Sequence, residues 1–114
     1  MSDIEAFLFD GLDLADTTPL IGRLSYEGDA LTVWVVSAQS RTEIAILKFT
    51  GITITSLWFD EQDAIEWPLD IIGFDSYADG ERWRFVLNCD SIEFGWRSAW
   101  PTKSEAGKHD RQRI

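Results

Sequence analysis

The sequence has a single cysteine and a single histidine among its 114 residues. One cysteine, Cys89, cannot form a disulfide within the chain and cannot supply the several thiolates of a structural zinc site. Cys89 also alternates with Phe85 and Leu87, so we expect it to be buried and unreactive. His109 lies in a polar segment near the end of the chain, where nothing would orient it as a base. Serine and cysteine nucleophiles activated by histidine are therefore excluded.

Glycine-rich loops and long apolar runs are absent as well. The eight glycines are scattered singly, so the sequence contains no phosphate-binding loop. No window approaches the roughly 20 apolar residues of a membrane-spanning helix. The N-terminal stretch MSDIEAFLFDGLD has acidic residues where a secretion signal has basic ones. We therefore expect a soluble, cytoplasmic protein without a membrane partner.

Positive charge is scarce. Ten Lys and Arg oppose 20 Asp and Glu, which gives a net charge of −10. Residues 1–100 hold 18 of the acids and six of the bases, a net charge of −12, and the remaining residues carry +2. Such a body repels the phosphates of nucleic acids and anionic membranes, so neither is a predicted partner. Acidic charge instead accelerates encounter with a basic protein.

The carboxylates show no spacing of a metal site or a catalytic site. A calcium-binding EF-hand needs ligands at alternate positions, a central glycine and a terminal glutamate, and residues 60–63, DEQD, have none of this. With 18 acids in residues 1–100, some pair always lies within reach, so a carboxylate pair is no evidence for glycoside cleavage. The sequence predicts no catalytic residue, metal or cofactor, and hence a protein that is not an enzyme.

The apolar residues that are present alternate with a period of two. Clear examples are residues 30–38, ALTVWVVSA, and residues 82–89, RWRFVLNC. β-Branched and aromatic residues in this pattern favour strands. Gly28-Asp29 and Asp79-Gly80 fit tight hairpin turns between such strands. About seven strands with little helix predict an all-β, single-domain antiparallel β-sandwich or open barrel.

The pattern also predicts faces and boundaries. On residues 82–89 the aromatic positions should face the core, whereas Arg82 and Arg84 should face solvent and pair with acids on a neighbouring strand. Residues 43–49 and 52–59 are apolar on both faces, which is typical of central strands. Residues 4–9 fit either an edge strand or one helical turn. Residues 1–100 form the expected domain, and residues 101–114 a disordered tail with few apolar side chains.

Two stretches resemble small bacterial all-β proteins. Residues 45–59, AILKFTGITITSLWF, are similar to a strand–glycine–strand unit of the form L-x-F-x-G-(I/V). Residues 82–94, RWRFVLNCDSIEF, resemble the closing hairpin of such proteins. Some of these proteins are uncharacterised, and others are immunity proteins, which bind and neutralise a toxin in the cell that produces it. The resemblance implies an all-β fold and a binding function, and it carries no catalytic residues over.

Three tryptophans do not fit the core pattern, since Trp58, Trp67 and Trp100 stand near strand ends or beside proline. Such residues either cap the ends of the sandwich or anchor a partner. Four acids lie between the first two tryptophans in the sequence. The predicted partner-binding residues are Trp58, Asp60, Glu61, Asp63, Glu66 and Trp67.

The leading functional prediction is a non-enzymatic protein-binding module with an acidic surface. One form of it is an immunity protein that neutralises a basic toxin. Two alternatives remain open at this stage. One is a ligand-binding or glycan-binding β-module, in which exposed aromatic side chains would stack on sugars. The other is a structural subunit whose edge strands pair into a dimer, and the sequence does not decide the oligomeric state.

Overall fold

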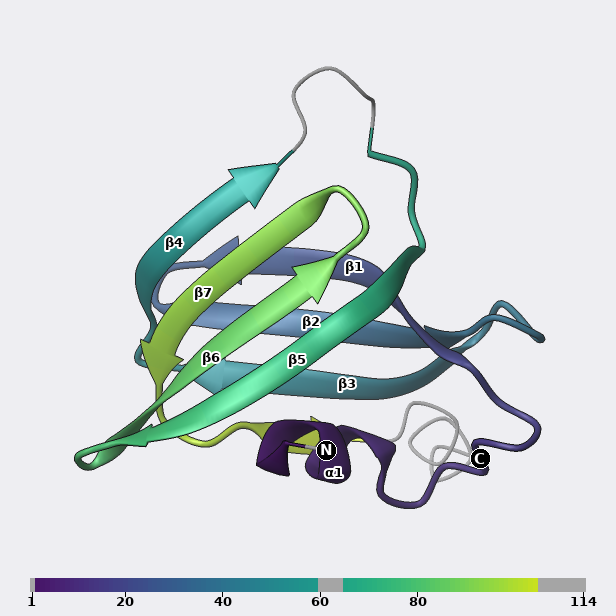
Figure 1. Cartoon of the computed structure of the whole chain (residues 1–114), viewed down its shortest axis with the longest axis horizontal. Helices are drawn as coiled ribbons and strands as arrows, with labels where there is room; N and C mark the ends of the chain where they lie inside the picture. Colours follow the sequence, from purple (N-terminus) through teal and green to yellow (C-terminus); the bar gives the residue numbers. More distant parts are fainter. Residues whose placement is uncertain (1, 60–64, 105–114) are drawn as a thin grey trace.

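A computed structural model of the chain describes residues 2–59 and 65–104 (Figure 1). The elements are α1 (Asp3–Phe9), β1 (Pro19–Glu27), β2 (Ala30–Ser37), β3 (Glu43–Thr50), β4 (Thr53–Phe59), β5 (Leu69–Asp79), β6 (Arg82–Cys89), β7 (Ile92–Ser98) and β8 (Thr102–Ser104). Antiparallel pairing joins the strands in the order β4-β7-β6-β5-β1-β2-β3-β8. The all-β prediction is confirmed as one open antiparallel sheet accompanied by one short helix in the described residues.

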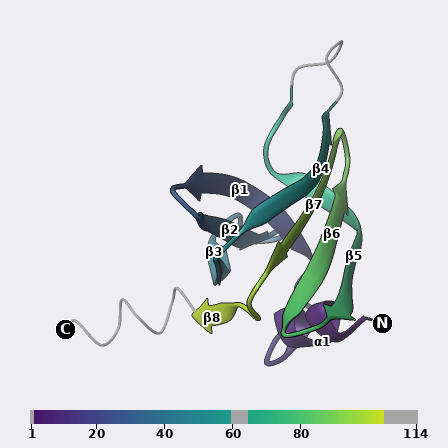
Figure 2. The same cartoon turned by 90° about the vertical axis from the view of Figure 1, so that its left-hand side faces the viewer.

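This sheet bends so that its two halves face each other. We call β4, β7, β6 and β5 the front half, and β1, β2, β3 and β8 the back half. Figure 2 shows the halves edge on, joined through the short β1–β5 pairing. Phe49 of β3 packs against Phe85 of β6 and Trp96 of β7, each with ring centroids 5.0 Å apart. Because three strands separate β3 from β6 in the sheet order, these contacts require the bend.

The core lies between the halves, and the alternation predicted its residues correctly on β2, β3, β6 and β7. On β6, Phe85, Leu87 and Cys89 are buried while Arg82 and Arg84 are exposed. The inward residues of β2, β3 and β7 are buried in the same way. Both predicted hairpins, at Gly28-Asp29 and Asp79-Gly80, are present between paired strands.

The stretch that fitted either an edge strand or a helical turn is helix α1, which closes one end of the core. Ser2 begins it with a capping box, in which its hydroxyl accepts from the Glu5 N–H and the Glu5 carboxylate accepts from the Ser2 N–H. Ile4 and Leu8, one turn apart, are fully buried. The Ile4 N–H also donates to Ser76 Oγ at 3.2 Å, which fixes the helix to β5.

One strand assignment is wrong in its position. Residues 52–59 were expected to form a central strand, but β4 is an edge strand whose seven residues are all exposed. The chain does not turn back from β3 into a hairpin. Gly51, at a φ of 67°, instead redirects it across the core to the far edge of the sheet, where β4 pairs with β7. β3 lies inside the sheet, between β2 and the short β8.

The prediction of a disordered tail over residues 101–114 is wrong for its first four residues. Pro101 is buried, and Thr102–Ser104 form β8, which pairs with Ile46–Lys48 of β3. A strand of three residues is too short to show a period, so the residue pattern does not predict it. The rest of the predicted tail, including His109, lies outside the described residues.

Candidate partner-binding surface

The outward side of the front half is an uncovered sheet face, and no described element lies over it (Figure 1). Its residues alternate with buried ones such as Phe94 and Trp96. Cross-strand pairing arranges them in three rows from β4 to β5. The rows are Trp58, Glu93, Asn88 and Gly73; Ser56, Gly95, Val86 and Asp75; and Thr53, Arg97, Arg84 and Tyr77.

One end of the front half is acidic. Here β4 ends, the β6–β7 turn lies beside it, and β5 begins: Phe59 pairs with Ile92, and the Asp90 N–H donates to the Asp70 carbonyl at 3.1 Å. We call the four exposed acids Glu66, Asp70, Asp90 and Glu93 the acidic end. None of them forms an ion pair with another described residue. Four carboxylates without such partners keep their negative potential directed at solvent.

The opposite end of the face carries Arg82, Arg84 and Arg97, which we call the arginine end. Arg82 and Arg84 were expected to pair with acids on a neighbouring strand, and this is wrong for the described residues. The ion pair is formed by Arg97, whose Nε lies 2.8 Å from Asp79 Oδ2. Arg82 donates to the Gly51 carbonyl at 3.0 Å, and Arg84 lies directly opposite Arg97 in the pairing.

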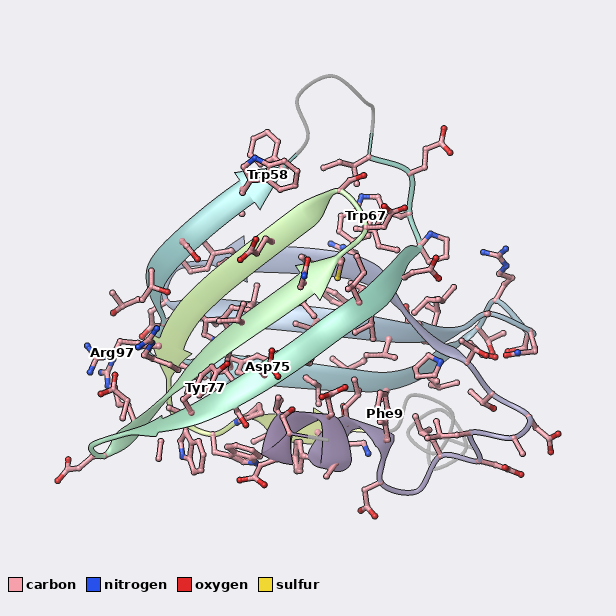
Figure 3. All side chains as sticks on the ribbon, in the orientation of Figure 1. Phe9, Trp58, Trp67, Asp75, Tyr77 and Arg97 are labelled. Carbon is pink, nitrogen blue, oxygen red and sulfur yellow. The ribbon has the colours of Figure 1, made fainter. Side chains whose placement is uncertain are left out.

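The three tryptophans that do not fit the core pattern have two different roles. Trp58 is 59% exposed and Trp67 is 42% exposed. Figure 3 shows both at the end of the front half where β4 ends and β5 begins, which is the acidic end. Trp100 instead caps the core, since its ring lies 4.7 Å from that of Trp83 and 5.6 Å from that of Phe7. The capping role therefore holds for Trp100, and Trp58 and Trp67 are available for contact.

The predicted site residues are thus located in part. Trp58, Glu66 and Trp67 lie together at the acidic end and are exposed. Asp60, Glu61 and Asp63 fall within residues 60–64, outside the described residues. Sequence reasoning missed Asp70, Asp90 and Glu93, because only the strand order brings them to the end of the sheet where Trp58 lies. In the sequence, these three acids are marked only by their positions beside a turn or opposite an apolar stripe. Many other polar residues have such positions.

Sequence reasoning also missed the exposed apolar edge. Along β4, Ile54, Leu57 and Phe59 are 39%, 52% and 46% exposed. Leu57 and Phe59 pair with the core residues Phe94 and Ile92, so they lie on the inward face at its outermost strand. Exposed apolar side chains gathered on one element mark contact surfaces more often than isolated ones do.

The described side chains provide contact rather than reactive groups. Burial, and secondarily the charge of Asp90, raises the pKa of the Cys89 thiol to about 12, so the thiol stays protonated and inert at neutral pH. Within residues 2–59 and 65–104, no three side chains of His, Cys, Asp or Glu gather to hold a metal ion. Among the same residues, no helix has the length and apolar content needed to cross a membrane.

The comparisons with known proteins support the fold alone. No protein-family model matches the chain, and no curated protein matches it in sequence. It is similar to the crystal structure of an uncharacterized protein from Neisseria gonorrhoeae, with a TM-score of 0.57 and 11% identity over 77% of this chain and 91% of that one. The similarity agrees with the resemblance to small bacterial all-β proteins in its fold, and at this identity it shows the fold alone.

Proposed function

We propose that the protein is a non-enzymatic binding module that recognises a basic protein through its acidic end. The observation that carries this proposal is that two exposed tryptophans, Trp58 and Trp67, lie at the same end of the front half as four acids that form no ion pair in the described structure. Trp is enriched among the residues that dominate binding energy, and carboxylates steer a cationic partner into contact. The net charge of −10 adds a long-range attraction of the same sign.

The two kinds of residue act on different steps of binding. Exposed carboxylates act through a field that reaches about 8 Å at physiological salt, so they mainly set the association rate. The indole rings of Trp58 and Trp67 would lose water on contact, so they mainly set the dissociation rate. Binding should therefore weaken as salt is added, chiefly through slower association.

A finer form of the proposal is that the partner is a toxin and the protein its immunity protein. The resemblance to small bacterial all-β proteins supports this reading. A basic toxin such as a nuclease also fits, because enzymes that bind nucleic acids carry the positive charge that the acidic end would meet.

Neutralising the acidic end tests the proposal. The variant Glu66→Gln, Asp70→Asn, Asp90→Asn and Glu93→Gln raises the net charge from −10 to −6 by removing four negative charges. A matched control makes the same four changes at exposed acids elsewhere, at Asp16, Glu27, Asp29 and Glu43. Both variants keep the buried core intact.

Immobilised wild type and both variants are exposed to a lysate of the source cells, and retained proteins are identified by mass spectrometry. A basic protein retained by wild type and control, but lost by the acidic-end variant, supports the proposal. With that protein purified, stopped-flow association at two ionic strengths should be about tenfold slower for the acidic-end variant at low salt. Equal rates for the two variants would refute a local role for these four carboxylates.

Two further readouts separate the alternatives. If the partner is a toxin, its co-expression with wild type or control should restore growth, and co-expression with the acidic-end variant should not. Glycan-array binding that is lost with Trp58→Ala or Trp67→Ala, and unchanged by charge neutralisation, would instead establish a glycan-binding module. That result would replace the basic-protein partner with a sugar.

A further inference from the structure

We infer that the free edge of β4 pairs antiparallel with β4 of a second copy of this chain, so that two front halves form one continuous sheet across a twofold axis. Such an interface is isologous, because the same strand serves both copies. This inference goes beyond the proposed function and does not depend on it. It concerns the backbone edge and the inward side chains of β4, whereas the basic partner is assigned to the acids of the acidic end and the side chains of Trp58 and Trp67.

The two edge strands of the sheet differ in the way expected if only one of them pairs with another chain. The β8 edge has only three residues and includes Lys103, and short strands and lysines are common devices that prevent edge pairing. The β4 edge has seven residues, TITSLWF, with no charged residue and no proline. Its backbone groups on the side away from β7 have no described strand beside them. A long, uncharged edge of this kind is a template for pairing.

The side chains of β4 extend the core face beyond the last strand. Leu57 pairs with Phe94 and Phe59 pairs with Ile92, and both Phe94 and Ile92 are buried. Leu57 and Phe59 themselves remain about half exposed because nothing in the described structure lies beyond them. A strand added at this edge would cover them and continue the apolar face by one more layer.

The local twist limits where the two copies meet. The register of β4 and β7 shifts between Ile54 and Ser56, which marks a bulge opposite Gly95. Bulges bend a strand and interrupt regular pairing. The regular stretch of the edge is therefore Ser56–Phe59, which is also its most apolar part, and we place the twofold axis near this stretch.

The lack of charge on β4 permits a second copy at this edge, and the charges beside the strand disfavour the parallel direction. Because β4 has no charge, two such strands meet without like charges opposite each other. The two ends of β4 have neighbours of opposite sign. Glu93 pairs with Trp58 near one end, whereas Arg97 pairs with Thr53 and Arg82 binds the Gly51 carbonyl at the other. Antiparallel pairing about Ser56–Phe59 keeps the arginine-flanked ends of the two copies on opposite sides of the twofold axis, whereas parallel pairing would set them side by side.

The net charge gives this interface a salt dependence of its own. Two bodies of charge −10 repel each other, and added salt screens that repulsion. Dimerisation through uncharged strands should therefore strengthen as salt rises. Binding of a basic partner should weaken over the same range, so the two associations respond to salt in opposite directions.

The test measures the mass of the full chain by light scattering and sedimentation velocity over a concentration series, at low and high salt. Leu57→Lys places a charge in the middle of the pairing stretch, where it would lose water without a partner in the second copy. Ile72→Lys makes the same kind of change at a 67% exposed residue of β5, away from the edge. Both variants alter net charge equally, and melting curves establish that both fold.

We expect wild type and Ile72→Lys to form dimers that tighten with salt, and Leu57→Lys to dimerise at least about tenfold more weakly. Backbone amides of Ser56–Phe59 should exchange more slowly in the wild-type dimer than in folded Leu57→Lys. A chain that is monomeric at every concentration and salt would overturn the inference. So would a dimer that Leu57→Lys leaves unchanged, since it would use another surface. Protection of these amides only after a basic protein is added would assign the edge to that partner instead.

Discussion

The ammonium group of Lys103 donates a hydrogen bond to the carbonyl oxygen of Phe7 over 3.0 Å, joining the last strand to the first helix. The same group donates to the Asp10 carbonyl at 2.6 Å and lies 5.9 Å from the centre of the Phe7 ring. The last carbonyls of a helix lack partners within it and carry partial negative charge, so a lysine there is favourable. Lys103 thereby fastens α1 over the end of the core.

Truncation on either side of β8 should therefore have unequal effects. Ending the chain after Pro101 removes the pairing with β3 and the contact of Lys103 with α1, and we expect the melting temperature to fall by several degrees. Ending it after Ser104 keeps both features and should change the melting temperature little, because residues 105–114 have only Ala106 and Ile114 as apolar side chains. Calorimetry of the two truncated chains checks this. Equal melting temperatures would mean that β8 contributes no stability.

Lys103→Met isolates the ammonium group, because methionine retains most of the apolar stem. The loss should be about 0.5–1.5 kcal/mol in the free energy of unfolding, since hydrogen bonds from a charged group to partly exposed carbonyls contribute about this much. Urea melts of the variant and of wild type give the difference. A neutral result would show that strand pairing alone holds β8 in place.

The period of two was enough to predict which face of β6 forms part of the core. Phe85 and Leu87 are buried, and Arg84 between them is exposed, because a strand sends successive side chains to opposite faces. The order of the strands was not accessible in the same way. β4 has the apolar composition of a central strand, but its position depends on the turn at Gly51 and on which edge remains open, and both are long-range properties.

The candidate site was also predictable where it depends on local sequence and not where it depends on strand order. Trp58 and Trp67 were predicted from their failure to fit the alternation, and Glu66 from its place beside them. Asp90 and Glu93 could not be predicted because they join the acidic end only through the pairing of β7 with β4 and β6. Three-residue β8 fell below the length at which a period is readable, so Lys103 was assigned to the tail.

Phe85 and Arg84 should differ sharply in their effect on stability. Phe85 is fully buried against Phe49 and Trp96, so Phe85→Ala should cost about 3–5 kcal/mol. Arg84 is exposed and lies opposite Arg97, and like charges directly opposite each other disfavour pairing. Arg84→Ala should thus be neutral within about 0.5 kcal/mol, or slightly stabilising. Denaturant melts that rank the two variants in the reverse order would invert the faces of β6.

Gly95 and Gly73 form a matched pair on the front face. A Cβ on Gly95 would lie 2.5 Å from Ser56 Oγ and 3.0 Å from Thr55 Oγ1, whereas a Cβ on Gly73 would meet nothing within 4 Å. Gly95→Ala should therefore force the exposed Ser56 and Thr55 side chains out of their present rotamers and destabilise by about 0.5–1.5 kcal/mol. Gly73→Ala should be neutral or slightly stabilising, since alanine has less conformational freedom to lose on folding. Adding Ser56→Gly to Gly95→Ala should recover part of the loss. Thermal melts of the three variants measure this, and a double variant no more stable than Gly95→Ala would show that the contact with Ser56 is not the cause.

The Cys89 thiol should make stability fall at high pH. Burial, together with the charge of Asp90, raises its pKa from an ordinary 9.0 to about 12 in the folded protein. Below pH 9 the thiol is protonated in both the folded and the unfolded states, so its contribution to stability is fully present. Between about pH 9 and 12 the unfolded thiol ionises and the folded one does not, so the unfolded state becomes progressively more favourable.

The slope of this loss is about 1.4 kcal/mol per pH unit once the unfolded thiol is ionised. To isolate the thiol from every other group, the measurement is a difference: the free energy of unfolding of wild type minus that of Cys89→Ala, from pH 8 to 10.5. The difference should shrink as pH rises. In parallel, a thiol reagent at pH 8 should modify the native protein far more slowly than the unfolded chain, because the reactive thiolate is rare and covered. A constant difference with rapid native labelling would show that Cys89 is accessible and ionises normally.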